Sequence, residues 1–113
     1  MYYERSIEEK LRRINDTFPV LMLTGPRQVG KSTLLTKMAD GNRKIVSLDD
    51  LSIRVQAKQD PALFLQRYSP PVLIGEIQYA PELLDYIKIH VDAKKQNGDY
   101  WLTGSQTLHM MKG

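Results

Sequence analysis

Residues 25–32 read GPRQVGKS and constrain this chain more than any other stretch, because they match the phosphate-binding pattern G-x-x-x-x-G-K-S. Gly25 and Gly30 can adopt backbone conformations that a Cβ would obstruct, so the loop can turn its N–H groups toward a phosphate chain. Lys31 would reach the outer phosphates, and the Ser32 hydroxyl would ligate Mg²⁺. The loop therefore predicts a site for a nucleotide phosphate tail.

The segments on either side of this loop support the prediction. Residues 20–23 are typical of a short buried strand, and residues 32–38 are typical of a helix that begins at the loop. The helix N-terminus would place a partial positive charge beside the phosphates. A glycine-rich turn that matches by chance is the alternative, and the strand–loop–helix context disfavours it. The residues expected to bind the nucleotide are Gly25, Pro26, Arg27, Gln28, Val29, Gly30, Lys31, Ser32 and Thr33.

The composition is that of an ordinary small globular domain. The chain has 113 residues, of which 42% are hydrophobic and 26% charged, so a single domain is expected. The net charge of +3 is mild and its cations are scattered, which does not indicate a dedicated nucleic-acid face. The chain has no cysteine, so disulfides and thiolate metal sites are excluded. Without an apolar signal core or a run long enough to span a bilayer, we expect a cytoplasmic protein.

The N-terminal segment predicts a packing helix over about residues 6–15. Ser6 can cap it, and Glu9 three residues later completes a capping box. Ile7, Leu11 and Ile14 fall on one face at helical spacing. Residues 15–19 should then break this helix and lead into the first strand.

The middle of the chain predicts a second strand over residues 44–48, followed by Asp49 and Asp50. These paired carboxylates would contact a metal, or Asp50 would simply be the N-cap of a helix from residue 51; the cap is the simpler interpretation. Asp60 followed by Pro61 starts another helix, which ends at residues 69–71.

The remaining segments alternate in the same way. Residues 72–74 predict a third buried strand, residues 82–95 a helix, and residues 100–102 a fourth strand. This alternation predicts an α/β fold with three αβα layers around a mainly parallel sheet. Ligands in such sheets bind at the carboxyl ends of the strands. The phosphate-binding loop, residues 75–76 and residues 103–105 should therefore converge.

Glu76 is the candidate catalytic base. A nucleotide-hydrolysing enzyme with this loop usually has an aspartate at the end of a buried strand, where it helps to hold Mg²⁺, and a neighbouring glutamate can polarise the attacking water. Here Glu76 occupies the glutamate position, but Gly75 stands where the aspartate is expected. An exposed carboxylate at a helix start is the alternative interpretation of Glu76.

Other polar residues near the predicted strand ends have two interpretations each. Thr103 and Ser105 either sense the outer phosphate or cap the next helix. Gln78 either orients water or is a solvated loop residue. His90 and His109 have no ligand partners nearby in the sequence and are expected to be ordinary residues of the surface or core edge. Tyr100 and Trp101 are expected in the core.

Four segments together resemble a known family: residues 25–32, 47–50, 75–84 and 102–106. They resemble the prokaryotic AAA+-type P-loop ATPases that carry a C-terminal domain of unassigned function, and the resemblance extends from about Tyr3 over nearly the whole chain. It implies an AAA-like core with a five-stranded parallel sheet, Walker A at 25–32, Walker B at 72–76 and a sensor at 103–105. The implied cofactors are ATP and Mg²⁺, and the implied catalytic residues are Glu76, Lys31, Thr103 and Ser105.

Two departures from the family shape the functional hypotheses. Gly75 replaces the Walker B aspartate. The family also continues well past residue 113, so the resemblance implies that residues 1–113 are a truncated AAA+ core without the last strand, the helical lid and the C-terminal domain. The first hypothesis is an ATP-binding module, derived from an ATPase, with weak or no hydrolysis. The second is a nucleotide-independent module that binds a protein or DNA partner. The third is an active ATPase in a homo-oligomer whose neighbouring subunit supplies an arginine finger.

Overall fold

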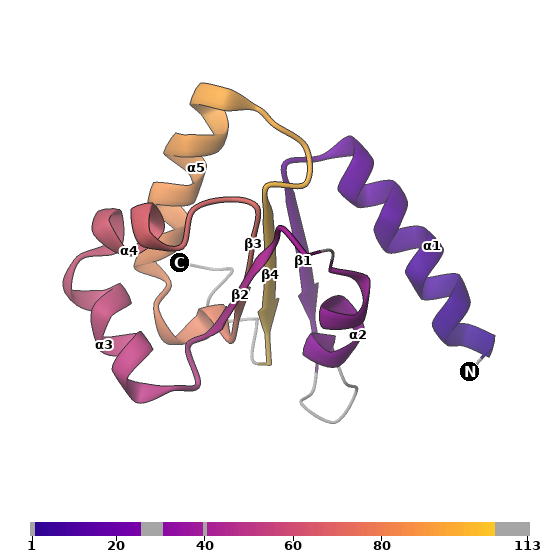
Figure 1. Cartoon of the computed structure of the whole chain (residues 1–113), viewed down its shortest axis with the longest axis horizontal. Coiled ribbons are helices and arrows are strands. Elements are labelled where there is room, and N and C mark those ends of the chain that lie inside the picture. The colour runs from indigo at the N-terminus through magenta and orange to yellow at the C-terminus, as the bar shows by residue number, and fades with distance from the viewer. Residues whose placement is uncertain (1, 26–30, 40, 106–113) are drawn as a thin grey trace.

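The computed structural model describes residues 2–25, 31–39 and 41–105. A central sheet is covered by α1 and α2 on one face and by α3, α4 and α5 on the other (Figure 1). The elements in chain order are α1 (Tyr2–Thr17), β1 (Val20–Thr24), α2 (Lys31–Met38), β2 (Lys44–Ser47), α3 (Leu51–Gln59), α4 (Pro61–Arg67), β3 (Val72–Gly75), the short 3₁₀ helix η2 (Ile77–Tyr79), α5 (Glu82–Lys94) and β4 (Tyr100–Gly104). No helix in this part of the chain is long and apolar enough to cross a membrane.

The sheet has four strands in the order β1-β4-β3-β2, and every pair is parallel. The register aligns Val72 with Tyr100 and Lys44, and it aligns Tyr100 with Val20. All strands therefore begin at one edge of the sheet and end at the other. The α/β class and the parallel sheet predicted from the alternating segments are confirmed.

The two central strands are apolar because they are covered on both faces. Every residue of β3 and every residue of β4 is buried, whereas β1 and β2, which lie at the outer positions of the described sheet, are only partly buried. A strand that is buried on both sides carries a continuous apolar run rather than an alternating one, as VLIG and YWLTG do here.

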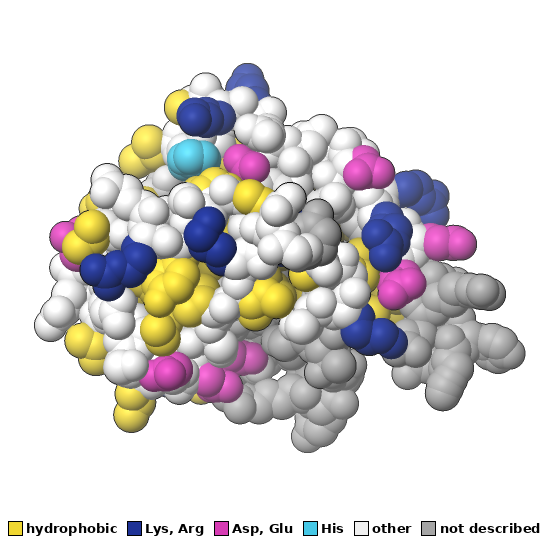
Figure 2. Space-filling model, viewed as in Figure 1, with side chains coloured by type: hydrophobic (Ala, Val, Ile, Leu, Met, Phe, Trp, Pro, Cys, Tyr) yellow, Lys and Arg dark blue, Asp and Glu magenta, His cyan; other side chains and the backbone are white. Residues whose placement is uncertain are grey.

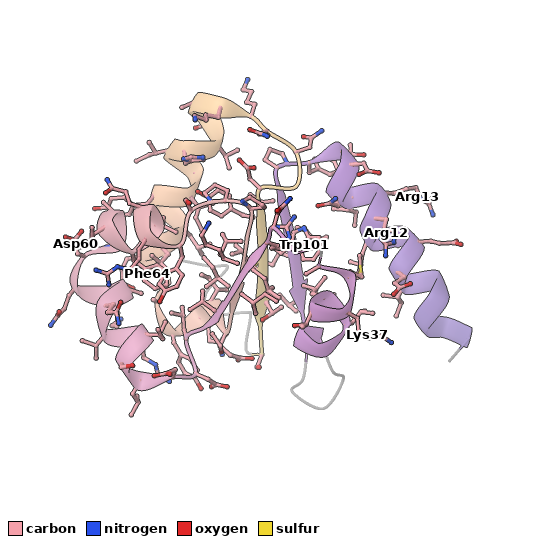
Figure 3. The ribbon with its side chains drawn as sticks, viewed as in Figure 1. Arg12, Arg13, Lys37, Asp60, Phe64 and Trp101 are labelled. Carbon is pink, nitrogen blue, oxygen red and sulfur yellow. The ribbon has the colours of Figure 1, made fainter. Side chains whose placement is uncertain are left out.

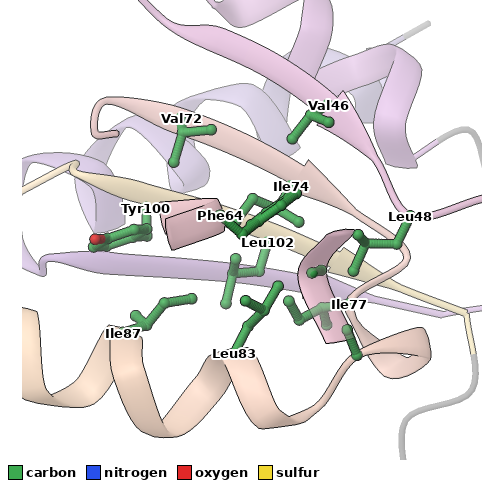
Figure 4. Close-up of a cluster of buried hydrophobic side chains, with 12 residues drawn as sticks. Val46, Leu48, Phe64, Val72, Ile74, Ile77, Leu83, Ile87, Tyr100 and Leu102 are labelled. Carbon is green, nitrogen blue, oxygen red and sulfur yellow. The ribbon is translucent and has the colours of Figure 1, made fainter. Parts of the chain in front are cut away.

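The larger core lies between the sheet and the α3–α5 layer (Figure 4). Alternate residues of the central strands, Val72, Ile74, Tyr100 and Leu102, point to this side. The buried members of this core are Val46, Leu48, Ala57, Phe64, Val72, Ile74, Ile77, Ala80, Leu83, Ile87, Tyr100 and Leu102. The expectation that Tyr100 belongs to the core is confirmed.

The smaller core lies on the opposite face, under α1 and α2. Trp101 is its largest side chain and lies between the sheet and this helical layer (Figure 3). Its indole Nε1 donates to Asn15 Oδ1 at 2.8 Å, and the Arg43 guanidinium stacks 3.7 Å from the ring centroid. The bond to Asn15 attaches the end of α1 to the sheet, and the Arg43 contact attaches the segment before β2. The buried members are Leu11, Leu21, Leu35, Met38, Leu73 and Trp101.

The predicted N-terminal helix is present, but its bounds were predicted wrongly. The helix runs from Tyr2 to Thr17, so Ser6 lies inside it and is not its N-cap. Thr17 donates its hydroxyl to Arg13 O at 2.7 Å, and Phe18 N donates to Ile14 O, so helical bonding continues to the residue before Pro19. An N-cap contributes only about 1 kcal/mol, which does not stop a helix whose preceding residues also accept helical geometry.

The predicted starts of α3 and α4 are confirmed. Asp50 is the N-cap of α3 and accepts from Ser52 N at 2.9 Å. Asp60 is the N-cap of α4, with Pro61 in the first turn and Leu63 N donating to its carboxylate. At the sheet, β2 ends at Ser47 rather than at residue 48, and β4 continues to Gly104, beyond the predicted residue 102.

The buried α5 face should account for much of the stability of the larger core. Leu83 is fully buried, whereas Ile89 on the same helix is 66% exposed. We expect Leu83→Ala to lower the free energy of unfolding by about 2–5 kcal/mol, because it removes apolar contacts and leaves a cavity. The matched change Ile89→Ala should cost about 0.5 kcal/mol or less. Urea denaturation followed by circular dichroism measures both, and equal losses would contradict this account of the core.

Candidate functional site

The carboxyl ends of β1, β3 and β4 meet at one edge of the sheet. Gly25 N donates to Gly104 O at 3.2 Å, which joins the end of β1 to the end of β4. Glu76 N donates to Thr103 Oγ1 at 3.2 Å, which joins the residue after β3 to β4. The ends of β1, β3 and β4 therefore lie side by side, as the sequence predicted for the strand ends.

Gly25 has the backbone conformation for which its residue type was expected. Its φ is +148°, a value that a residue with a Cβ rarely adopts. This conformation lets the chain leave β1 and turn toward α2, which begins at Lys31. Pro26, Arg27, Gln28, Val29 and Gly30 lie outside the described residues, and the side chains of Lys31, Ser32 and Thr33 are not described either. The predicted nucleotide contacts of these residues remain predictions.

Glu76 is held in an uncommon conformation at the end of β3. Its φ of +57° and ψ of +52° are left-handed, which costs a residue with a side chain on the order of 1–3 kcal/mol. It precedes η2, and its carbonyl accepts from Tyr79 N at 3.1 Å. The side chain is buried, with the residue only 8% exposed. The alternative interpretation of Glu76 as an exposed carboxylate at a helix start is therefore wrong, and its catalytic role stays a prediction.

Three side chains form a closed hydrogen-bond network at this edge. Glu76 Oε1 accepts from Ser105 Oγ at 2.7 Å and from Gln78 Nε2 at 2.8 Å. Ser105 N in turn donates to Gln78 Oε1 at 3.3 Å. Hydrogen bonds to an ionised carboxylate are stronger than those between neutral groups, so this network fixes the orientation of the carboxylate. Gln78 is not a solvated loop residue.

Gly75 leaves an open position between two hydroxyl groups. A Cβ at Gly75 would lie 3.3 Å from Ser47 Oγ and 3.5 Å from Thr103 Oγ1. Gly75 is not among the described glycines with a positive φ, so its backbone does not require glycine. The position thus has room for a side chain if Ser47 shifts by a few tenths of an ångström. Ser47 was not among the predicted site residues, because its pairing with Gly75 depends on the register of β2 with β3.

The end of β3 lacks the aspartate that was expected to help hold a magnesium ion. Gly75 supplies no carboxylate, and the described part of the chain contains no group of three or more His, Cys, Asp or Glu side chains that could hold a metal ion. Asp50 caps α3 instead, and the hydrogen bonds from Ser52 lower the pKa of its exposed carboxyl group. The expected magnesium ligand, Ser32, has no described side chain.

A hollow lies at the other end of the sheet, between α4 and α5. It has a volume of about 430 Å³ and is lined in part by Leu65, Tyr86 and Tyr100. His90 Nε2, at its wall, lies 3.9 Å from Asp99 Oδ2, and burial raises the pKa of Asp99. Burial, with the neighbouring Asp99 charge, raises the pKa of Tyr100 to about 12. His90 is a residue of the core edge, as expected, and His109 lies outside the described residues.

Comparison with known proteins identifies the family. A family model described as an AAA domain matches residues 17–113. This chain belongs to the AAA domain family. The family and the four-stranded parallel sheet agree, and together they indicate a nucleotide-binding, ATPase-like module.

Curated relatives share this region but do not name an activity. Two uncharacterized proteins, from Mycobacterium tuberculosis and Mycobacterium bovis, are each 30% identical to the chain over 101 residues. The match covers 89% of this chain and 23% of each relative, so the chain spans about a quarter of the length of these proteins. No solved structure matches the chain significantly. The predicted C-terminal domain and its absence here stay expectations.

The hydroxyl of Ser105 should stabilise the fold through the buried Glu76 carboxylate. We expect Ser105→Ala to lower the free energy of unfolding by about 1.5–3 kcal/mol, because it removes a charge-assisted hydrogen bond to the buried Glu76 carboxylate. Ser52→Ala is the matched control, since the Ser52 hydroxyl donates to Asp50 Oδ1 at 2.8 Å on the exposed surface. The control should cost about 0.5 kcal/mol or less. Chemical denaturation measures both variants, and a loss in Ser105→Ala no larger than the control would show that the buried bond contributes little.

Proposed function

We propose that this chain is an ATP-binding AAA module whose magnesium-dependent hydrolysis is weak because Gly75 replaces an aspartate. The observation that carries the proposal is the convergence at one sheet edge: Gly25 is bonded to the end of β4, and the buried Glu76 is bonded to Thr103 and Ser105 of the same strand end. α2 begins at Lys31, within the predicted phosphate-binding pattern of residues 25–32. In this proposal Glu76 is the catalytic base, the loop that begins at Gly25 is the phosphate-binding site, and Thr103 and Ser105 are the polar groups between them.

In this proposal each residue has a definite role. Backbone N–H groups of Gly25 and of residues 27–33 bind the triphosphate, and the Lys31 ammonium group neutralises its outer phosphates. Glu76 orients the attacking water, while Thr103 and Ser105 contact the outer phosphate or that water. Ser32 would ligate Mg²⁺, which would supply charge neutralisation at the phosphates. The nucleobase of the bound nucleotide is adenine by resemblance to the AAA+ ATPases. A neighbouring copy of the chain would supply the arginine finger.

The binding role of Lys31 can be tested directly. We expect Lys31→Ala to raise the Kd for fluorescently labelled ATP about 10- to 100-fold, because it removes charge-assisted bonds to the phosphates. Lys37→Ala is the matched control, since Lys37 is exposed in the last turn of the same helix (Figure 3). Lys37→Ala should bind as the wild type does, and unlabelled GTP in competition tests the base preference.

Equal and negligible binding by the wild type and Lys31→Ala would favour the nucleotide-independent interaction module instead. The face in Figure 2 does not favour a DNA partner for that alternative. Lys and Arg side chains are interspersed there with Asp and Glu, and no broad area of one sign is visible among the described residues. Binding to a phosphate backbone generally uses a clustered basic patch.

Restoring the missing carboxylate should restore turnover. We expect Gly75→Asp to raise ATP turnover in the presence of Mg²⁺ by about tenfold or more, because a carboxylate at the strand end helps to hold the hydrated metal. Gly75→Asn is the matched control, with the same shape and no charge, and should not raise turnover. Phosphate release with and without Mg²⁺ measures the effect. Unchanged turnover in Gly75→Asp would mean that the missing aspartate is not what limits hydrolysis.

A further inference from the structure

The Gln78 side chain connects two different strand ends. Its Nε2 donates to Glu76 Oε1, after β3, at 2.8 Å, and its Oε1 accepts from Ser105 N, after β4, at 3.3 Å. The Ser105 N–H is always a donor, so it identifies the facing atom of Gln78 as the oxygen. Rotating the amide by half a turn would place donor against donor at Ser105 and acceptor against acceptor at Glu76. The amide therefore fits this place in one orientation.

The backbone that carries Gln78 is held by the core. Gln78 is the middle residue of η2, between the fully buried Ile77 and the partly buried Tyr79. Ala80 N donates to Ile77 O at 3.0 Å, and Ala80 is also fully buried. Because the core holds the backbone of Gln78, its side chain can orient the groups that it contacts at Glu76 and Ser105.

The same carboxylate oxygen of Glu76 receives both side-chain donors. Ser105 Oγ and Gln78 Nε2 lie 2.7 Å and 2.8 Å from Oε1, so the carboxylate cannot rotate without breaking both bonds. We propose that Gln78 is a positioning residue: it fixes the Glu76 carboxylate and couples it to Ser105 at the end of β4. This inference rests on the proposed function, in which Glu76 activates water and Ser105 faces the outer phosphate. A shift of Ser105 on nucleotide binding would then reach Glu76 by two routes, directly through the Ser105 hydroxyl and through the Gln78 amide.

Two variants separate the two ends of the Gln78 amide. Gln78→Leu removes the donor to Glu76 and the acceptor for Ser105 N. Gln78→Glu keeps an acceptor for Ser105 N but loses the donor and adds a negative charge beside Glu76. Gln96→Leu makes the same change at an exposed glutamine after α5 and is the control.

NMR of the nucleotide-free protein measures the contacts of Gln78 with Glu76 and Ser105 without requiring ATP turnover. We expect Gln78→Leu to shift the signal of the Glu76 δ-carboxyl carbon and to lower the exchange protection of the Ser105 amide about fivefold or more. Gln78→Glu should shift the carboxyl signal but keep the Ser105 protection, and Gln96→Leu should change neither. An unchanged Glu76 carboxyl signal in Gln78→Leu overturns the inference.

A kinetic measurement then separates positioning from a merely structural role. In the Gly75→Asp protein, Gln78→Leu should lower kcat about tenfold or more and leave the KM for ATP within about twofold, because Gln78 acts on the base and not on ATP binding. An unchanged kcat, or a loss confined to KM, overturns the inference; if Gly75→Asp does not turn over ATP, the NMR result decides. If the wild-type protein binds no ATP, the proposed function is refuted. The NMR measurement would still test whether Gln78 fixes the orientation of the Glu76 carboxylate.

Discussion

The parallel pairing of β3 with β4 is the constraint on which the rest of the site depends. Both strands are buried on both faces, and their register places the end of β3 beside the end of β4. A slip of one residue would turn every side chain of β3 to the other face of the sheet, so the two cores oppose it. Because the register is fixed, Glu76 N meets the Thr103 hydroxyl, and the Glu76 carboxylate meets Ser105.

Gly75 and Glu76, which are adjacent at the end of β3, each have a residue type that their backbone conformation does not call for. Gly75 has no side chain although its backbone does not require glycine, while Glu76 carries a side chain in a left-handed conformation that disfavours one. The unfavourable backbone at Glu76 is offset by its hydrogen bonds to Thr103, Ser105 and Gln78. The end of β3 therefore holds one buried carboxylate in a fixed orientation, and the residue before it carries no side chain.

The sequence predicted those features that depend on local chemistry or on the alternation of segments. The α/β class, the parallel sheet, the convergence of the strand ends and the Asp50 and Asp60 caps all follow from short patterns, and the structure confirms them. The start of α1 was predicted wrongly, because a capping signal at Ser6 contributes less than continued helical bonding.

The rest of the site could not be predicted because it depends on contacts between distant residues. The contact between Gln78 and Ser105 requires the strand register and the path of η2, and neither is encoded in a local pattern. The left-handed backbone of Glu76 has no signal in its residue type, since glutamate rarely adopts it. The position of Ser47 opposite Gly75 likewise becomes visible only once β2 and β3 are paired.

The strand order also has a consequence for how the chain folds during synthesis. Among the described strands β1 pairs only with β4, the first strand with the last. While the ribosome makes the chain from its N-terminus, β1 has no sheet partner until residues 100–104 have left the exit tunnel. Such long-range closure is slow, and the exposed strand is open to wrong pairing in the interval. The edge of the sheet that unites Gly25, Glu76 and Ser105 can thus form only after β4 has been made.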